Sequence, residues 1–169
     1  AQEPDRYNFW KEREQSHALR DGDVSAFSAT VDWGALAARA TEPEPQPTGW
    51  SNRWYVTSLE IGQGVLAEQP GAGDVRPNWV GRIQPYGVYV PTTYDAADPA
   101  PLTWVLHSLG VNHNQYSATA PRMLADMCER RGSICATTLG RAGDGWYFDE
   151  AETDFWEVWN RVAGTYSLD

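Results

Sequence analysis

The segment 102–166 constrains the fold most, because its apolar patterns alternate between those of strands and those of helices. The run Leu102–Leu106 is apolar apart from one Thr, which is typical of a strand covered on both faces in a parallel sheet. Helical patterns follow over 121–132 and 149–166, separated by a short strand pattern over 133–140. This order predicts a βαβα unit with a right-handed crossover.

The ends of these elements carry residues that suit helix boundaries. Pro121 fits the first turn of the helix 121–132, and Gly132 fits its end. Asp149 is placed to cap the helix 149–166. The apolar face of this second helix is predicted to contain Phe155, Trp159, Val162 and Tyr166.

Upstream of this unit the character of the chain changes twice. Irregular helical spacing over 6–40 predicts two modest helices, and the alternating prolines of 41–49 are typical of an extended linker. Strand patterns follow over 53–61 and 81–90. We therefore expect a helical amino-terminal extension with a proline-rich linker over 1–48 and a domain over 49–169. The extension is either a brace over the domain or an interaction arm.

Composition excludes several classes of function. With 41% apolar residues and nine Trp, the chain is expected to be globular. A formal net charge of -10 repels phosphate backbones, so nucleic acid is not an expected partner. The sequence contains no apolar run as long as the roughly 18 residues of a membrane span, so none is predicted.

The two cysteines, Cys128 and Cys135, are too few for a four-ligand zinc site. They either form a disulfide or are both free and buried; we favour the disulfide, which indicates an oxidising compartment and a secreted or extracytoplasmic protein. Acidic residues over 144–154 resemble a calcium cluster only in composition, because their spacing matches no EF-hand loop. Neither a metal site nor a cofactor is predicted.

Four segments in order carry a resemblance to a known family. YGVYVPTTYD, PLTWVLHSLGVNHNQY, SICATTLGRAGDGWYFDE and the ending through TYSLD resemble secreted esterases and prolyl-oligopeptidase-like serine hydrolases of the α/β-hydrolase fold. The resemblance covers about residues 82–169. It implies the amino-terminal half of a doubly wound α/β sheet, here preceded by a helical and β extension.

The resemblance also implies roles for residues near the carboxyl ends of the predicted strands. In such hydrolases, the loop between the third strand and the first major helix supplies one backbone N–H of the oxyanion hole. We assign that N–H to Leu109, and expect His107 to hold the loop by a hydrogen bond. The residues expected near the substrate are Ser108, Gly110, His113, Tyr116, Arg141, Trp146 and Tyr147.

Two features depart from the family pattern. Ser108 stands where the family usually has Gly, and the sequence contains no Gly-x-Ser-x-Gly. We therefore hypothesise a two-chain hydrolase that cleaves small carboxylic esters through an acyl-enzyme, in which a second chain supplies the Ser-His-Asp triad and completes the sheet. A serine peptidase uses the same parts. The rival hypothesis is a secreted, aromatic-rich binding module without catalytic activity.

Overall fold

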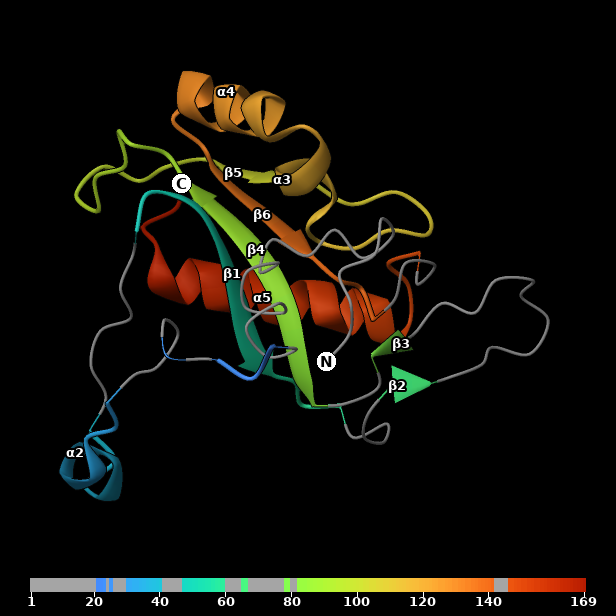
Figure 1. Cartoon of the computed structure of the whole chain (residues 1–169). Coiled ribbons are helices and arrows are strands. Elements are labelled where there is room, and N and C mark those ends of the chain that lie inside the picture. Colours follow the sequence, from blue (N-terminus) through green and yellow to red (C-terminus); the bar gives the residue numbers. More distant parts are fainter. Residues whose placement is uncertain are drawn as a thin grey trace.

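The computed structural model describes residues 21–23, 25, 30–40, 47–59, 65–66, 78–79, 82–141 and 146–169. It has a mixed α/β architecture around a four-stranded mixed sheet in the order β1-β4-β6-β5 (Figure 1). β4 is antiparallel to β1 and to β6, whereas β5 and β6 are parallel. The main-sheet strands are β1 (Gly49–Val56), β4 (Ile83–Val90), β5 (Leu102–Trp104) and β6 (Ile134–Thr138). β2 (Val65–Leu66) and β3 (Asn78–Trp79) form a separate two-stranded sheet.

Helices cover both faces of the main sheet. α3 (Gln115–Thr119) and α4 (Pro121–Arg131) connect β5 to β6, and α5 (Glu150–Thr165) follows β6. Ile134 and Ala136 of β6 belong to the core beneath α5, whereas Cys135 between them packs with α4. Since successive strand residues point to opposite faces, α4 and α5 lie on opposite sides of the sheet. The predicted strand, helix, strand and helix are all present.

The boundary residues of α4 and the first residues of α5 lie where the sequence predicts them. Pro121 opens α4, and Gly132 ends it in the left-handed conformation with φ 59°. Asp149 is the N-cap residue of α5, as predicted, but it has φ 50° and its side chain makes no capping hydrogen bond. The buried residues of α5 also differ from the predicted apolar face. Val162 and Tyr166 are buried as predicted and Phe155 and Trp159 only half-buried, while the helix buries Ala151, Asp154 and Val158.

The other expected elements differ in length. β1 starts at Gly49 and ends at Val56, rather than covering 53–61, and β5 ends at Trp104 rather than continuing to Leu106. Of the two helices expected over 6–40, the described part contains α2 (Trp33–Ala37), which buries none of its residues. The remainder of that expectation concerns residues 1–20 and others outside the described ranges.

The strand order β1-β4-β6-β5 leaves β1 and β5 at the two edges of the main sheet. The residues of β5 are only half-buried, so the expected cover on both faces is not met within the described chain. On the side of β5 away from β6, Ala100 pairs in parallel with Leu168. The N–H of Ala100 donates to Ser167 at 3.0 Å, and that of Asp169 donates to Ala100 at 3.2 Å. Residues 167–169 thus begin a parallel pairing along this edge.

Candidate functional site

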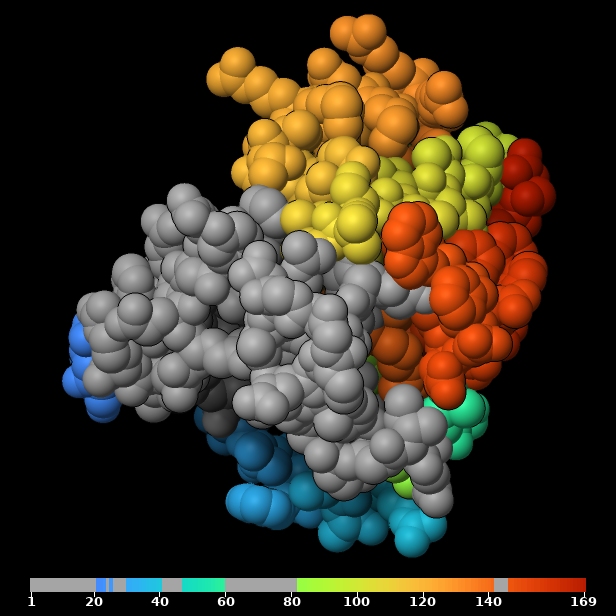
Figure 2. Space-filling view, turned by 90° about the vertical axis from the view of Figure 1, so that its right-hand side faces the viewer, coloured from blue at the N-terminus to red at the C-terminus, as the bar shows by residue number. Residues whose placement is uncertain are grey.

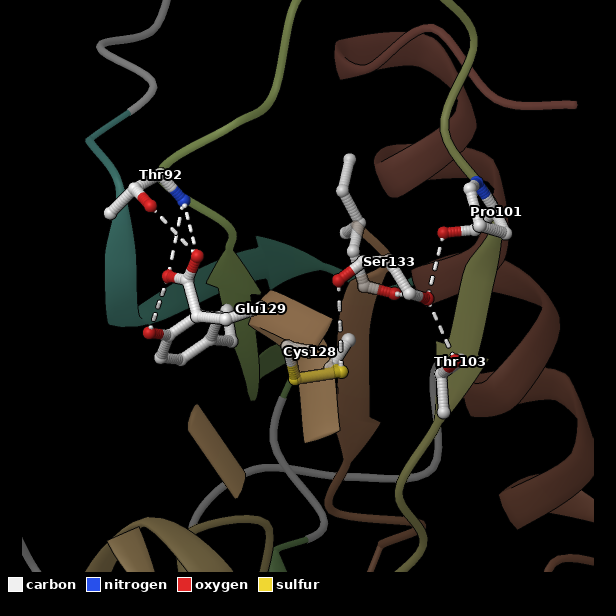
Figure 3. Close-up of a disulfide and its surroundings, with 9 residues drawn as sticks. Thr92, Pro101, Thr103, Cys128, Glu129 and Ser133 are labelled. Atoms are coloured by element: carbon white, nitrogen blue, oxygen red, sulfur yellow. Dashed lines mark hydrogen bonds between the residues drawn. A yellow bond between two sulfur atoms is a disulfide. The ribbon is translucent and has the colours of Figure 1, made fainter. Parts of the chain in front are cut away.

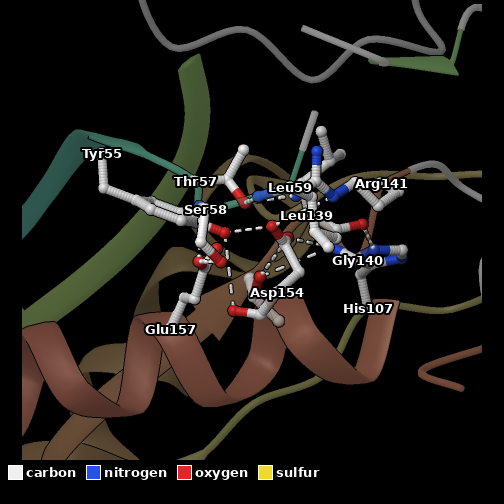
Figure 4. A network of polar contacts seen from close by, with 11 residues as sticks. Tyr55, Thr57, Ser58, Leu59, His107, Leu139, Gly140, Arg141, Asp154 and Glu157 are labelled. Carbon is white, nitrogen blue, oxygen red and sulfur yellow. Dashed lines mark hydrogen bonds and ion pairs between the residues drawn. The ribbon is translucent and has the colours of Figure 1, made fainter. Parts of the chain in front are cut away.

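The loop after β5 and the segment after β6 leave the sheet at the same end, since these two strands are parallel. This is the end at which open α/β sheets bind ligands. His107 joins the two segments, because its Nε2 lies 2.8 Å from the carbonyl oxygen of Leu139 (Figure 4). Its Nδ1 lies 3.0 Å from the carbonyl oxygen of Ser108. The imidazole therefore holds the loop against the end of β6, as the sequence predicts.

Successive backbone amides of this loop have different partners. The N–H of His107 donates to the Tyr147 hydroxyl at 3.2 Å, and the N–H of Ser108 donates to Oε1 of Gln115 at 2.8 Å. Among the described residues, the N–H of Leu109 has no hydrogen-bond acceptor. The Leu109 side chain is 60% exposed, and Gly110 follows with φ 78°. The backbone donor of Leu109, like those of Leu106 and Gly110, is therefore not used within the described chain.

Ser108 tolerates the position where the family usually has glycine. It is not among the residues with positive φ, so its Cβ causes no left-handed strain. Its hydroxyl instead accepts a hydrogen bond from Nε2 of Gln115 at 3.2 Å. The departure from the family pattern therefore leaves the backbone of the loop unstrained.

The next polar residues of the loop point inward. His113 is 4% exposed and accepts from Nδ2 of Asn114 at 3.2 Å, while its Nδ1 has no hydrogen-bond partner in the described chain. Burial, together with nearby His107, lowers the pKa of His113 to about 3, so the ring is neutral. Tyr116 is half-buried against the cluster of Leu124 and the cysteines. In this conformation the loop does not present His113 to a ligand, contrary to the sequence-based expectation.

The segment after β6 is conformationally strained. Positive φ angles, which disfavour residues other than glycine, occur at Arg141, Trp146, Tyr147 and Asp149 (φ 68°, 55°, 55° and 50°). Such strain persists only where surrounding contacts hold it, and it is concentrated at functional sites. Trp146 is 67% exposed, whereas Tyr147 turns inward so that its ring lies 5.4 Å from that of His107. Figure 2 shows this segment beside the loop after β5.

A buried polar network holds the strained segment (Figure 4). Asp154 of α5 is completely buried and accepts hydrogen bonds from the Tyr55 hydroxyl, from Oγ1 of Thr138 at 2.9 Å and from the N–H of Gly140 at 3.1 Å. Nε of Arg141 lies 3.4 Å from Asp154. Burial raises the pKa of Asp154, and these donors offset part of that rise.

Arg141 belongs to this network and not to an open surface. Only 7% of it is exposed, and its Nη2 donates to Oγ1 of Thr57 at 2.7 Å. The sequence placed Arg141 in a substrate wall, but the structure turns it inward because it is the cationic partner of buried Asp154. A buried carboxylate requires such a partner.

The disulfide lies on the opposite face of the sheet. Cys128 and Cys135 are joined, with Cα atoms 6.1 Å apart (Figure 3). Beside it the Glu129 carboxylate accepts from the Thr92 N–H at 3.1 Å, the Thr92 hydroxyl at 2.8 Å and the Tyr89 hydroxyl at 2.9 Å. These contacts fix the end of α4 to the loop after β4.

A metal site and a membrane-spanning helix are both absent from the described ranges. No group of three or more His, Cys, Asp or Glu side chains in that part of the chain is arranged to hold a metal ion. None of the described helices is both long enough and apolar enough to cross a membrane.

Comparison with known proteins finds no family model that matches the chain and no similar curated protein. The support for a function therefore comes from this site and from the resemblance of its loop to that of α/β-hydrolases. Sequence analysis missed three of its residues: Gln115, Tyr147 as a partner of His107, and Asp154 as a buried group. In the sequence Asp154 is one of the acidic residues over 144–154, and carboxylates are seldom buried without a partner. The signal available in the sequence was helical spacing: Asp154 precedes Val158 by one turn, so both lie on the same buried face of α5.

Proposed function

We propose that this chain carries the oxyanion-hole loop of an α/β-hydrolase-type serine hydrolase that cleaves small carboxylic esters. The observation that carries this proposal is the unbonded N–H of Leu109, two residues after His107, at the carboxyl end of β5. β5 is the third strand of the main sheet in chain order, and the loop after it leads into α3 and α4. That is the position from which α/β-hydrolases provide an oxyanion donor.

The proposed chemistry is acyl transfer to a serine. When the serine hydroxyl attacks the ester carbonyl, negative charge develops on the carbonyl oxygen, and the Leu109 N–H stabilises it. The collapse of the tetrahedral intermediate releases the alcohol and leaves an acyl-enzyme, which water then hydrolyses. Exposed Trp146 supplies apolar surface close to the reacting group.

The triad comes from polypeptide outside these 169 residues, which contain no Gly-x-Ser-x-Gly. The free side of β5 supports a further strand there, since Leu168 already pairs in parallel with Ala100. A strand in that register would end at the same edge of the sheet as Leu109. We propose a second chain as its source. The disulfide fits an oxidising compartment, so we place the protein outside the cytoplasm.

A fluorophosphonate probe and p-nitrophenyl acetate test the function in material purified from the native source. The proposal expects ester turnover and a labelled serine on polypeptide outside residues 1–169. Labelling on a separate chain supports the two-chain form, and labelling on a longer form of this chain replaces it with a one-chain form. Absence of both labelling and turnover contradicts the hydrolase.

Leu109 itself is tested by a matched pair of variants in the active material. Leu109→Pro removes the N–H, whereas Leu109→Ala keeps the N–H and removes most of the side chain. Loss of one oxyanion donor lowers kcat by about 10²–10³. We expect that loss for Leu109→Pro and less than tenfold for Leu109→Ala. Equal effects would assign the role of Leu109 to its side chain and contradict the proposal.

Exposed tryptophans favour a binding module as the second candidate function. Trp33, Trp54 and Trp156 are 73%, 49% and 52% exposed. Exposed Trp rings provide apolar area with a polar N–H for recognition. This candidate expects no fluorophosphonate label, together with binding to immobilised polysaccharide that is lost in Trp156→Ala.

A further inference from the structure

We propose that Gln115 and Tyr147 are positioning residues that hold the two amides directly before Leu109, and thereby fix the position of the Leu109 N–H that is left for a ligand. This inference rests on the proposed function, since it explains how that donor is held. The two side chains reach the loop from different elements: Gln115 opens α3, and Tyr147 lies between β6 and α5.

Tyr147 is itself held tightly. Its hydroxyl accepts the His107 N–H at 3.2 Å. Its ring lies directly over Gly140, where an added Cβ would come within 2.9 Å of Cε1 of Tyr147. Tyr147 also has φ 55°, a conformation that needs support from its surroundings. The close fit to Gly140 and the contact with His107 provide such support.

Gln115 makes two contacts with a single residue. Its Oε1 accepts the Ser108 N–H at 2.8 Å, and its Nε2 donates to the Ser108 hydroxyl at 3.2 Å. Glycine at position 108 would allow only the first of these contacts. The serine that departs from the family pattern therefore gives the side-chain amide of Gln115 a complementary partner.

Together the two contacts orient the turn that follows. His107 and Ser108 have their N–H groups occupied by side chains from two sides, and the His107 ring holds the Leu139 carbonyl. The next amide, that of Leu109, is left unbonded among the described residues. A donor held in place before the substrate binds does not have to reorganise during the reaction, which is the basis of oxyanion stabilisation.

Backbone amide hydrogen exchange of the full chain, followed by NMR, tests the inference without requiring activity. In the unchanged protein, the amides of His107 and Ser108 should exchange more slowly than that of Leu109 after correction for intrinsic rates. Leu109 exchanging as slowly as the other two would overturn the proposal, and this measurement requires no variant.

Variants separate the two contacts. Tyr147→Phe should accelerate exchange at His107 by roughly tenfold and leave Ser108 unchanged, and Gln115→Leu should do the reverse. Gln115→Glu keeps an acceptor oxygen and should restore slow exchange at Ser108. Ala118→Ser, at an exposed position on the same helix, is the control and should change neither rate. Unchanged Ser108 exchange in Gln115→Leu would overturn the role of Gln115.

The failure of this inference is distinguishable from the failure of the proposed function. Slow exchange at His107 and Ser108 without any serine labelling would contradict the hydrolase but not the pinned loop. In active material, Gln115→Leu should lower kcat with little change in KM, and Gln115→Glu should recover most of the loss. Full activity in Gln115→Leu would show that the contact does not position the donor.

Discussion

The two faces of the main sheet are stabilised in different ways, although each is covered by helix. Beneath α5, Val158 and Val162 form one cluster with buried residues of β1, β4 and β6, and half-buried residues of β5 pack against it. The polar network of Asp154 lies at one end of this face. Beneath α4, the buried cluster is small, with Leu124 beside the joined cysteines.

The difference shows how a small core is supplemented. The α5 face has enough apolar contact to accommodate a buried carboxylate with its partners, whereas the α4 face adds a covalent link. Trp50 also packs on this second face, with its ring over Gly87. The proposed ligand donor, Leu109, lies in the loop that leads to the α4 face, so the covalently linked side also supports the site.

The largest expected effect comes from removal of the Asp154 carboxylate on the α5 face. Asp154→Ala leaves Arg141 and the other buried donors without their acceptor, and should lower the free energy of unfolding by about 3–5 kcal/mol. Urea denaturation followed by circular dichroism measures the change. Asp154→Asn, which keeps one acceptor oxygen, is the matched control and should lose less. Equal losses in both variants would show that charge matters more than the acceptor.

The second prediction concerns the disulfide on the α4 face. Replacing both Cys128 and Cys135 by Ala should destabilise the protein by about 2–3 kcal/mol, because the link that closes a short loop in the unfolded chain is lost. Thermal unfolding of the double variant beside the oxidised protein gives the value. A loss below about 0.5 kcal/mol would mean that the small buried cluster stabilises this face without the disulfide.

The third prediction concerns the fit between Trp50 and Gly87. A Cβ at position 87 would lie 2.1 Å from Cη2 of Trp50 and 2.9 Å from Cγ2 of Thr137. Gly87→Ala should therefore destabilise the protein by about 1–3 kcal/mol through overpacking. The double variant with Trp50→Leu tests the cause, since it should recover part of the loss. Simple addition of the two effects would contradict a direct clash.

The smallest expected effect is the pH dependence due to His113. Because burial lowers its pKa from 6.5 to about 3, only the unfolded chain binds a proton between these values. Its contribution to stability is thus present above pH 6.5 and is lost as the pH falls. Between pH 6.5 and 5.5 the unchanged protein should lose about 1 kcal/mol more than His113→Gln. If the free energy of unfolding of both proteins changed equally with pH, the His113 imidazole would be exposed to water in the folded protein.

Local pattern was sufficient to predict the carboxyl-terminal half of the fold. The apolar runs and the boundary residues Pro121 and Gly132 predicted β5, α4, β6 and α5 nearly in place, since periodicity and capping act over a few residues. The cysteine pair was favoured for the same local reason. The assignment of the α5 face was incomplete, because burial of Asp154 depends on donors from β1, β6 and the following turn.

The sequence by itself determined the order of the main-sheet strands, α4 and α5 along the chain and the position of the loop that contains Leu109. Only the tertiary structure decided which strands are neighbours, which amides of that loop are occupied, and that Arg141 points inward. The reason is physical: propensity and periodicity are properties of neighbouring residues. The contact of Tyr147 with His107 and the pairing of Leu168 with Ala100 join residues far apart in the chain, and they form only when the whole sheet is assembled.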